Sequence, residues 1–267
     1  MGFVDWNTLW NNEMLVTRRV RLNSGPFWDE VATREGGAAG FPEELTELQL
    51  ARIAVQPKET VLEIGPGLGR LTIPLARAAA ALTAVDPSAQ MLERLRSLAD
   101  AEGIATLHTV HCSWEKAEEV TQLTPHTVIM ASYSLFMQDM RSQLQRMLRL
   151  ATDRIVLFVP GDPRLPEAVE RMIYGAKVSS QMADHVLLFN LLYEMGVDAD
   201  VEVFTFPGEK RYRSREEALE QQMHYYDLPT EKQPAMAAYL EEQFREEAGE
   251  WILPRMRKTA MLRWRVQ

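Results

Sequence analysis

The sequence predicts an α/β protein whose core is a parallel sheet covered by helices on both faces. Two observations carry this prediction. Between residues 60 and 160, short apolar runs alternate with segments of helical periodicity, and this alternation is typical of βαβ units. A glycine-rich turn also follows the first apolar run directly, in the sequence VLEIGPGLGRL at residues 61–71.

Five apolar runs in this region are predicted to be the strands of the sheet. Two segments between them place their apolar residues on one helical face each. The predicted strands are TVLEI (60–64), ALTAV (81–85), ATLHTV (105–110), TVIMA (127–131) and RIVLFV (154–159). The apolar helical faces consist of Met91, Leu92, Leu95, Leu98 and Ala99 in one segment and of Met140, Leu144, Met147 and Leu148 in the other.

The rest of the chain surrounds this core. Residues 1–58 are predicted to form a helical N-terminal extension that acts as a lid, and residues 59–267 to form one domain. Helical insertions are expected in that domain around 162–183 and 207–250. The two late strands are predicted at VEVFTF (201–206) and AMLRWRV (260–266).

The net charge and the composition limit which binding partners and which cellular compartment are expected for this protein. The formal net charge is −9, which argues against a nucleic-acid partner because phosphate binding usually leaves a basic footprint. The basic segment RMRKTAMLRWR (255–265) is interpreted as an amphipathic strand with solvated cations. A single cysteine, Cys112, excludes an intrachain disulfide and fits a reducing compartment. With no run of about 18 apolar residues and no signal-peptide pattern, the expectation is a cytoplasmic protein with no membrane span.

The spacing of the glycine turn excludes two common ligands. A P-loop that starts at Gly65 would need glycine, lysine and then serine or threonine at positions 70–72, where the chain has Arg-Leu-Thr. A dinucleotide fingerprint needs a third small residue for close packing of helix on strand, and that position is the bulky Arg70. The pattern that remains is acid-x-Gly-x-Gly-x-Gly, with Glu63 as the acid.

At this motif the chain resembles the class I S-adenosylmethionine (SAM)-dependent methyltransferases, over roughly residues 58–160. The resemblance implies a Rossmann-like, seven-stranded, mostly parallel sheet with an antiparallel last strand, and SAM as the cofactor. It implies that Glu63 holds the cationic amino-acid end of SAM. Asp86, at the end of the second predicted strand, can accept hydrogen bonds from two ribose hydroxyls. A helix N-cap ahead of Pro87 is the structural alternative for Asp86.

Further cofactor contacts follow from the same resemblance. Ser113 stands where the family often carries an aspartate that binds the adenine amino group. Trp114 either covers the adenine ring or anchors the following helix to the sheet, and Met91 lies where the family often packs a side chain near adenine. The predicted cofactor-binding residues are Glu63, Gly65, Pro66, Gly67, Gly69, Asp86, Pro87, Met91, Ser113, Trp114 and Ala131.

The acceptor is predicted to be a small molecule. FWDEVA (27–32) resembles the N-terminal helix of small-molecule methyltransferases of the menaquinone/ubiquinone-biosynthesis type. VLEIGPGLGRLTIPLA also resembles the first motif of the rRNA adenine dimethylases. However, ASYS (131–134), after the fourth strand, matches poorly the Asn/Asp-Pro-Pro-Tyr motif of methylases that act on base amino groups. An RNA (adenine) methyltransferase and a non-catalytic SAM-binding protein are the alternatives.

Methyl transfer by in-line displacement asks little of side chains, because positioning and exclusion of water lower most of the barrier. A general base is needed only when the acceptor carries a proton, as a hydroxyl or thiol does. The candidates for that role are His185, His224, Tyr133 and Tyr174, each of which can also be structural. No metal site is predicted, because HTVHC (108–112) alternates along a strand and no second cluster appears.

Overall fold

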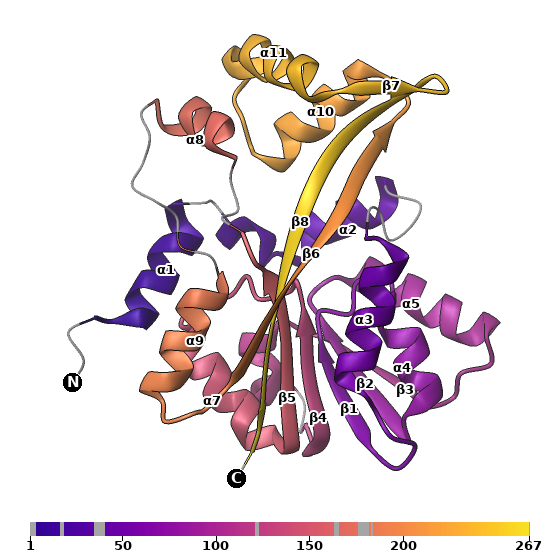
Figure 1. Cartoon of the computed structure of the whole chain (residues 1–267). Coiled ribbons are helices and arrows are strands. Elements are labelled where there is room, and N and C mark those ends of the chain that lie inside the picture. Colours follow the sequence, from indigo (N-terminus) through magenta and orange to yellow (C-terminus); the bar gives the residue numbers. More distant parts are fainter. Residues whose placement is uncertain are drawn as a thin grey trace.

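The computed structural model describes residues 4–16, 19–34, 41–120, 123–162, 166–175, 182 and 184–266. Within these ranges, no helix is both long and apolar enough to cross a membrane. One mixed sheet runs through the molecule, with helices on both faces and a long two-stranded ribbon that rises from it (Figure 1).

The described residues form a sheet of eight strands. These are β1 (Thr60–Ile64), β2 (Ala81–Asp86), β3 (Leu107–His111), β4 (His126–Ser132), β5 (Ala151–Pro160), β6 (Asp200–Tyr212), β7 (Arg245–Glu247) and β8 (Glu250–Arg265). Five parallel strands follow the order β3-β2-β1-β4-β5, after which β8 pairs antiparallel with both β5 and β6. The last strand is therefore antiparallel, as expected.

The predicted count of seven strands is wrong by one, because of the three-residue strand β7. This strand pairs with β8, and Glu247 lies opposite Glu250 across a turn of Ala248 and Gly249. Both turn residues have positive φ, 54° and 80°, as a tight hairpin turn requires. A strand this short and polar has no hydrophobic alternation for a sequence to display.

Eleven α-helices and three short 3-10 helices accompany the sheet in the described residues. The α-helices are α1 (Trp6–Val16), α2 (Gly25–Arg34), α3 (Glu43–Ile53), α4 (Thr72–Ala78), α5 (Ala89–Ala101), α6 (Ala117–Val120), α7 (Met140–Leu150), α8 (Glu167–Tyr174), α9 (Asp184–Glu194), α10 (Arg215–Tyr225) and α11 (Gln233–Gln243). The 3-10 helices are Arg19–Leu22, Trp114–Lys116 and Thr230–Lys232.

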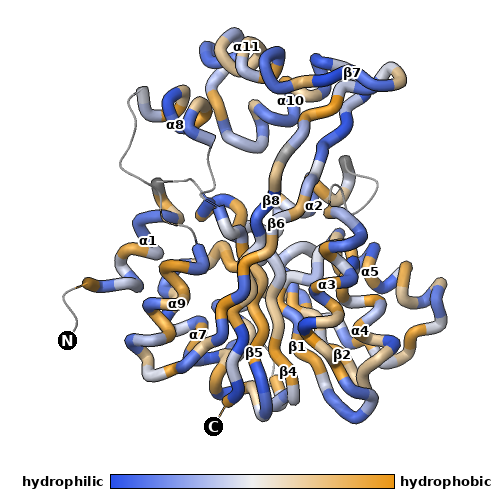
Figure 2. Tube along the Cα trace, in the orientation of Figure 1, coloured by the Kyte–Doolittle hydropathy of each residue, from blue (hydrophilic) through white to orange (hydrophobic). Residues whose placement is uncertain are grey.

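Apolar side chains on the two faces of the sheet form two large cores. One core includes residues of α1, α7 and α9, and the other includes residues of α3, α4 and α5. Figure 1 shows these two groups of helices on opposite sides of the central strands, and Figure 2 shows hydrophobic residues concentrated along those strands. Because both faces are covered, the central strands are continuous apolar runs rather than alternating ones.

Strands β6 and β8 continue far beyond the other strands and form an arm, residues 205–258. Their pairing runs on to Tyr212 opposite Trp251, whereas the last pair between β5 and β8 is Pro160 opposite Thr259. At the tip, α8, α10 and α11 pack around a separate apolar core with Tyr212. The basic segment RMRKTAMLRWR lies in β8, as expected.

The insertion predicted at 207–250 contains helices α10 and α11, but its first residues belong to a strand. Residues up to Tyr212 continue β6, and α10 begins only after them. Pro207 and Gly208 suggest a strand break in the sequence. However, β6 lies at the edge of the sheet, where proline is tolerated because one row of N–H groups needs no partner.

The insertion predicted at 162–183 is described only in part. Helix α8 lies within it. Residues 163–165, 176–181 and 183 lie outside the described residues.

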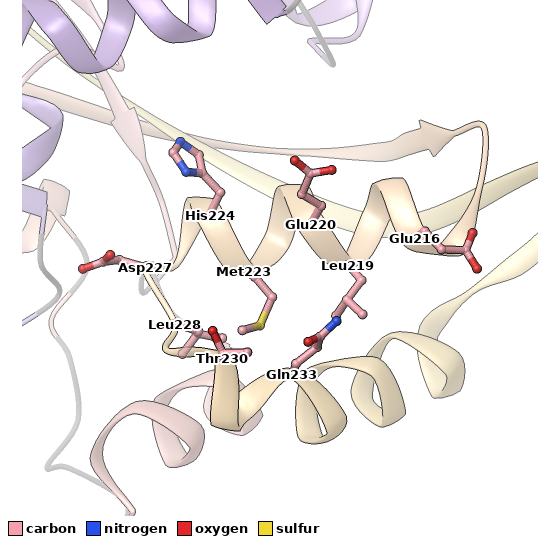
Figure 3. A pocket seen from close by; sticks show the side chains of 9 residues that line it. All are labelled: Glu216, Leu219, Glu220, Met223, His224, Asp227, Leu228, Thr230 and Gln233. Atoms are coloured by element: carbon pink, nitrogen blue, oxygen red, sulfur yellow. The ribbon is translucent and has the colours of Figure 1, made fainter.

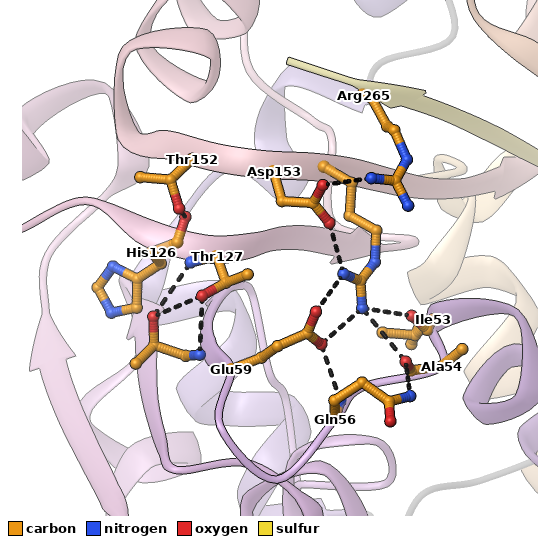
Figure 4. Close-up of polar contacts among 11 residues, drawn as sticks. Ile53, Ala54, Gln56, Glu59, His126, Thr127, Thr152, Asp153 and Arg265 are labelled. Atoms are coloured by element: carbon orange, nitrogen blue, oxygen red, sulfur yellow. Dashed lines mark hydrogen bonds and ion pairs between the residues drawn. The ribbon is translucent and has the colours of Figure 1, made fainter. Parts of the chain in front are cut away.

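An ion network joins the amino ends of β1 and β5 to the end of α3 (Figure 4). Arg154 contacts both carboxylate oxygens of Glu59, at 2.7 and 2.8 Å, and donates to the Ile53 carbonyl at 3.0 Å. Asp153 contacts Arg154 at 2.8 Å and Arg265 at 2.9 Å. These contacts fix the N-terminal extension to one end of the sheet, and the pocket lies at the other end.

Candidate active site

A pocket of about 420 Å³ opens where the carboxyl ends of β1, β2 and β4 meet. Its walls come from three parts of the chain: the strand ends with their loops, the N-terminal extension and the arm. Ligands of open parallel sheets bind at this edge, where the loops diverge. A pocket of this volume suits a small-molecule ligand.

The glycine turn closes the pocket at the end of β1. The Gly65 N–H donates to the Val85 carbonyl at 2.8 Å, which ties the turn to β2. Gly65 has a φ of +70°, and a Cβ there would lie 2.3 Å from the Cβ of Ser134. Only glycine allows this approach of the two loops. Gly69 instead serves packing, because a Cβ there would lie 2.6 Å from Leu95 on α5.

Glu63 places a buried carboxylate in the pocket wall. The residue is 2% exposed, and burial raises the pKa of its carboxyl to about 7. Its Oε2 has no hydrogen-bond partner within the described residues, although buried polar atoms normally have one. A cationic group in the pocket would satisfy this oxygen and lower the raised pKa. Glu63 therefore fits an ammonium group such as the one SAM carries.

Asp86 places a second carboxylate at the end of the neighbouring strand. It is 5% exposed, and burial is the main cause that raises its pKa, to about 6. Its Oδ1 accepts the N–H of Ser88 at 2.8 Å. The cap of α5 is Ser88, whose hydroxyl accepts the Met91 N–H at 3.1 Å. The alternative that Asp86 is itself the helix cap is therefore wrong.

Helix α2 of the N-terminal extension covers the turn between β2 and α5. The Asp29 carboxylate accepts hydrogen bonds from the Ser88 hydroxyl at 2.6 Å and from the Gln90 N–H at 3.0 Å. A Cβ at Gly25, the first residue of α2, would lie 2.2 Å from the Pro87 carbonyl oxygen. Glycine therefore lets α2 lie directly on the backbone of this turn.

Aromatic side chains form the side of the pocket between α2 and the loop after β4. Trp28 stacks with Phe136 at a centroid distance of 6.2 Å and meets Phe27 edge to face at 5.1 Å. The Trp28 indole N–H donates to the Leu22 carbonyl at 2.6 Å, which fixes the ring. Aromatic walls of this kind suit a planar, apolar ligand.

The loop after β4 is held on several sides. Tyr133 has a φ of +58°, an uncommon conformation for a residue other than glycine that often marks functional sites. Its hydroxyl is hydrogen-bonded to the Thr259 hydroxyl on β8, and its N–H donates to the Phe158 carbonyl at 2.9 Å. The Ser134 hydroxyl donates to the Ile64 carbonyl. The loop is thus tied to β1, β5 and β8.

Most of the predicted cofactor residues converge on this pocket. Ser113, Gly69 and Ala131 are not among its lining residues, because Ser113 precedes a 3-10 helix and Ala131 is fully buried in β4. Trp114 belongs to the core and also lines the pocket, a position that is compatible with both of its predicted roles. The predicted residues that line the pocket are Glu63, Gly65, Pro66, Gly67, Asp86, Pro87, Met91 and Trp114.

Of the four candidate bases, Tyr133 lines the pocket. His224 lines a second cavity on the arm, between α10 and the start of α11 (Figure 3), and its ring stacks on Phe27 at 5.8 Å. His185 on α9 and Tyr174 on α8 line neither cavity. Burial lowers the pKa of His185. Cys112 is a buried thiol of the core, and burial raises its pKa.

Several lining residues were not predicted from the sequence. Arg70 directly follows the glycine turn, but in the sequence it is only a departure from the dinucleotide and P-loop motifs, and no signal of its own indicates a ligand. The arm residues lie in segments that were predicted as a helical insertion and a solvated strand. The unpredicted polar lining residues include Asn23, Arg70, Ser132, Lys210, Gln222 and Arg257.

The sequence is similar to known methyltransferases over its central part. Residues 61–153 match the family model described as a methyltransferase domain. An uncharacterised protein of Haemophilus influenzae is 28% identical over 176 residues, which is 65% of this chain and 64% of that protein. The ribosomal RNA small subunit methyltransferase A of Magnetococcus marinus is 45% identical over 58 residues, 22% of this chain and 21% of that protein. Each match thus spans less than two thirds of the relative.

Solved structures share the fold at low sequence identity. YcgJ from Bacillus subtilis superposes with a TM-score of 0.60 at 14% identity, over 85% of this chain and 99% of that chain. Magnesium protoporphyrin IX methyltransferase from Synechocystis, with bound SAM, gives a TM-score of 0.50 at 13% identity, over 98% and 99% of the two chains. These similarities establish the fold of the sheet and its helices.

Proposed function

We propose that this chain, a member of the class I SAM-dependent methyltransferase superfamily, transfers a methyl group from SAM to a small-molecule acceptor. One observation carries the proposal: the unsatisfied, buried Glu63 oxygen and the Asp86 carboxylate flank the glycine turn in a single pocket. The arrangement presents two acceptors to a ligand that offers both an ammonium and vicinal hydroxyls.

The residues of the pocket fit SAM from end to end. Glu63 would hold the ammonium, the backbone at Gly65 and Gly67 would lie against the amino-acid part, and Asp86 would accept from the ribose hydroxyls. Met91 and Trp114 supply apolar surface for adenine. When bound, SAM supplies an activated methyl group on a sulfonium.

The protein's own part in the reaction is to position the two reactants and exclude water. Helix α2 and the loop after β4 form two sides of the pocket. Asp29 holds α2 in place through Ser88, and Tyr133 holds the loop in place through Thr259. Tyr133 is the one predicted base that lines the pocket, but its hydroxyl is hydrogen-bonded to Thr259. We therefore assign Tyr133 a positioning role.

Isothermal titration with S-adenosylhomocysteine (SAH), followed by turnover of methyl-labelled SAM with a small-molecule cell extract, tests the proposal. Wild type should bind SAH and label a small product, and Glu63→Gln should bind SAH at least about tenfold more weakly through loss of a charge-assisted bond. Glu93→Gln, an exposed glutamate on α5, is the matched control. Absence of SAH binding by wild type would overturn the proposal, and binding without labelling would favour a non-catalytic SAM-binding protein.

Methylation of RNA is the second candidate. The local similarity to ribosomal RNA methyltransferases favours it, whereas the net charge of −9 and the Ser-Tyr-Ser sequence at 132–134 do not. Filter binding of ribosomal RNA across a salt series distinguishes the two, because phosphate contacts make affinity fall with salt. Salt-dependent RNA retention together with labelling of RNA would replace the small-molecule acceptor.

A further inference from the structure

We propose that the acceptor carries an anionic group, a carboxylate or a phosphate, which is bound by Arg70, Lys210 and Arg257. The proposal rests on the proposed function and names the class of its substrate. The three cations come from the glycine turn, β6 and β8, and all three line the pocket.

The charges of the pocket wall form two halves that meet at the glycine turn, where Arg70 interacts electrostatically with Glu63. Its carboxylates, Glu63 and Asp86, lie at the strand ends, where the cofactor is proposed to bind. The other charged side chains that line it are the three cations. A half-enclosed site lined by one sign of charge attracts the opposite sign, so this half favours an anionic ligand.

Arg70 is a half-buried guanidinium that is hydrogen-bonded to none of the described carboxylates, although the Glu63 charge acts on it. Its Nη1 donates to the Thr46 hydroxyl at 2.9 Å and its Nη2 to the Ser132 hydroxyl at 3.4 Å, and it lies 4.5 Å from the centroid of the Phe41 ring. Burial lowers the pKa of Arg70, and the nearby Tyr133 and Glu63 act against that shift. A further anion beside the guanidinium would offset the cost of its burial.

Arg257 brings a second guanidinium to the same ring, 5.4 Å from the Phe41 centroid. Its side chain lies across Gly208, where a Cβ would be only 3.2 Å from the Arg257 Nε. Two like charges gathered on one aromatic ring repel each other. A carboxylate or phosphate can accept hydrogen bonds from both guanidinium groups at once and offset that repulsion.

Lys210 faces the pocket from the same side of the arm. Phe206 lies opposite Arg257 across the two strands. Every second residue of a strand lies on the same face, so positions 206, 208 and 210 share one face of β6. Lys210 therefore lies on the face that carries Arg257. Its Nζ lies 5.2 Å from the Tyr212 ring centroid.

Aromatic rings connect this cationic half with the cofactor half. Phe41 and Tyr133 lie 5.0 Å apart at the cationic side, and Trp28 with Phe136 forms the wall nearer the cofactor turn. The acceptor that fits is therefore a planar, largely apolar molecule that carries an anionic group. Net attraction to such a molecule comes from ring stacking together with the charge-assisted hydrogen bonds.

The test compares three probes of one shape by isothermal titration of the SAH-saturated protein: 2-naphthoate, 2-naphthyl phosphate and the neutral 2-naphthamide. We expect at least one anion to bind about tenfold more tightly than the amide, as a charge-assisted bond would give. The anion whose affinity exceeds that of the amide by the larger factor shows whether the site prefers a carboxylate or a phosphate. Equal binding of anions and amide, or binding of none of them, overturns the proposal.

Substitutions of the three cations identify which of them cause the preference for anionic probes. Lys210→Met with Arg257→Met should reduce the anion preference to less than about twofold and leave SAH affinity unchanged. Lys258→Met, an exposed cation of β8 paired with Asp162, is the matched control and should keep the preference. A preference that survives in the double variant overturns the assignment to the arm. If Arg70→Met weakens SAH and leaves the preference intact, Arg70 serves the cofactor and the proposal fails for that residue.

The same titrations keep the two proposals distinguishable. Wild type that fails to bind SAH but still prefers the anionic probes would contradict the methyltransferase proposal alone. Wild type that binds SAH but shows no preference would contradict the anionic acceptor alone.

Discussion

The Asp29 carboxylate on α2 accepts a hydrogen bond from the Ser88 hydroxyl at 2.6 Å. Ser88 caps α5 and directly follows Asp86 and Pro87, so this contact joins the N-terminal extension to the turn that is proposed to bind ribose. The hydrogen bond from Ser88 also lowers the pKa of Asp29, so this contact favours the ionised carboxylate. The position of α2 over the proposed cofactor site therefore depends on the side chain of Ser88, in the turn between β2 and α5.

Asp29→Ala should loosen the attachment of α2 to this turn. We expect the dissociation constant of SAH to rise about fivefold, equivalent to about 1 kcal/mol, because α2 loses the two hydrogen bonds that Asp29 accepts at the start of α5. Isothermal titration measures the change. Asp5→Ala removes a comparable exposed aspartate, which bonds Thr8 at the start of α1, and should leave SAH affinity unchanged. Equal affinity of Asp29→Ala and wild type would show that α2 does not contribute to cofactor binding.

Glu63→Gln should raise the stability of the ligand-free protein at pH 8 and should also weaken the binding of SAH. The folded pKa of about 7 exceeds the ordinary value of 4.5. The folded state therefore holds the proton more tightly, and stability is lost as pH rises from about 4.5 to 7, by about 2 to 3 kcal/mol. The neutral amide removes that loss.

Thermal unfolding of the ligand-free protein at pH 4.5 and pH 8 measures this effect. The unfolding temperature of the Glu63→Gln variant should exceed that of wild type at pH 8 and match it at pH 4.5. A variant that is less stable than wild type at pH 8 would mean that a hydrogen-bond partner, rather than a bound ligand, stabilises the Glu63 carboxylate.

The sheet and the cofactor half of the pocket could be predicted because they depend on local sequence. Strands β1 to β5 are short apolar runs, and the glycine turn carries its own spacing. Glu63 and Asp86 each end a strand, and parallel strands bring such positions to one edge of the sheet. Ser113, predicted as a cofactor contact, does not line the pocket, whereas the next residue, Trp114, does.

The cationic half could not be predicted, because its members meet only through tertiary structure. Lys210 and Arg257 share one face of the ribbon through the antiparallel register of β6 and β8, which continues past Pro207 against the local signal. Arg70 belongs to the recognised turn, but its direction depends on Thr46 and Ser132 from other elements. Pairings of this kind are set by packing rather than by local propensity.

Gly65→Ala should destabilise the protein more than Gly67→Ala. Both glycines have positive φ, +70° and +55°, and therefore share a backbone strain of about 1 to 2 kcal/mol with alanine. The Gly65 Cβ would also collide with Ser134, whereas a Cβ at Gly67 would meet no atom within 4 Å. Urea unfolding should show an additional loss of about 1 to 3 kcal/mol for Gly65→Ala. Equal losses would contradict the close approach of the β1 and β4 loops.

Tyr133→Phe and Thr259→Val together test whether the hydroxyl pair holds the loop after β4 to the arm. Thr259 is fully buried, so each single change leaves one hydroxyl without its partner and should cost about 1 to 3 kcal/mol of unfolding free energy. The double variant removes both hydroxyls and should lose less than the sum, with a coupling of about 1 kcal/mol in the cycle. Arg149→Ala with Thr259→Val, a pair on separate parts of the fold, should be additive and serves as the control. Additive losses for Tyr133→Phe and Thr259→Val would show that the two hydroxyls do not stabilise each other, and the positioning role of Tyr133 would then rest on its backbone alone.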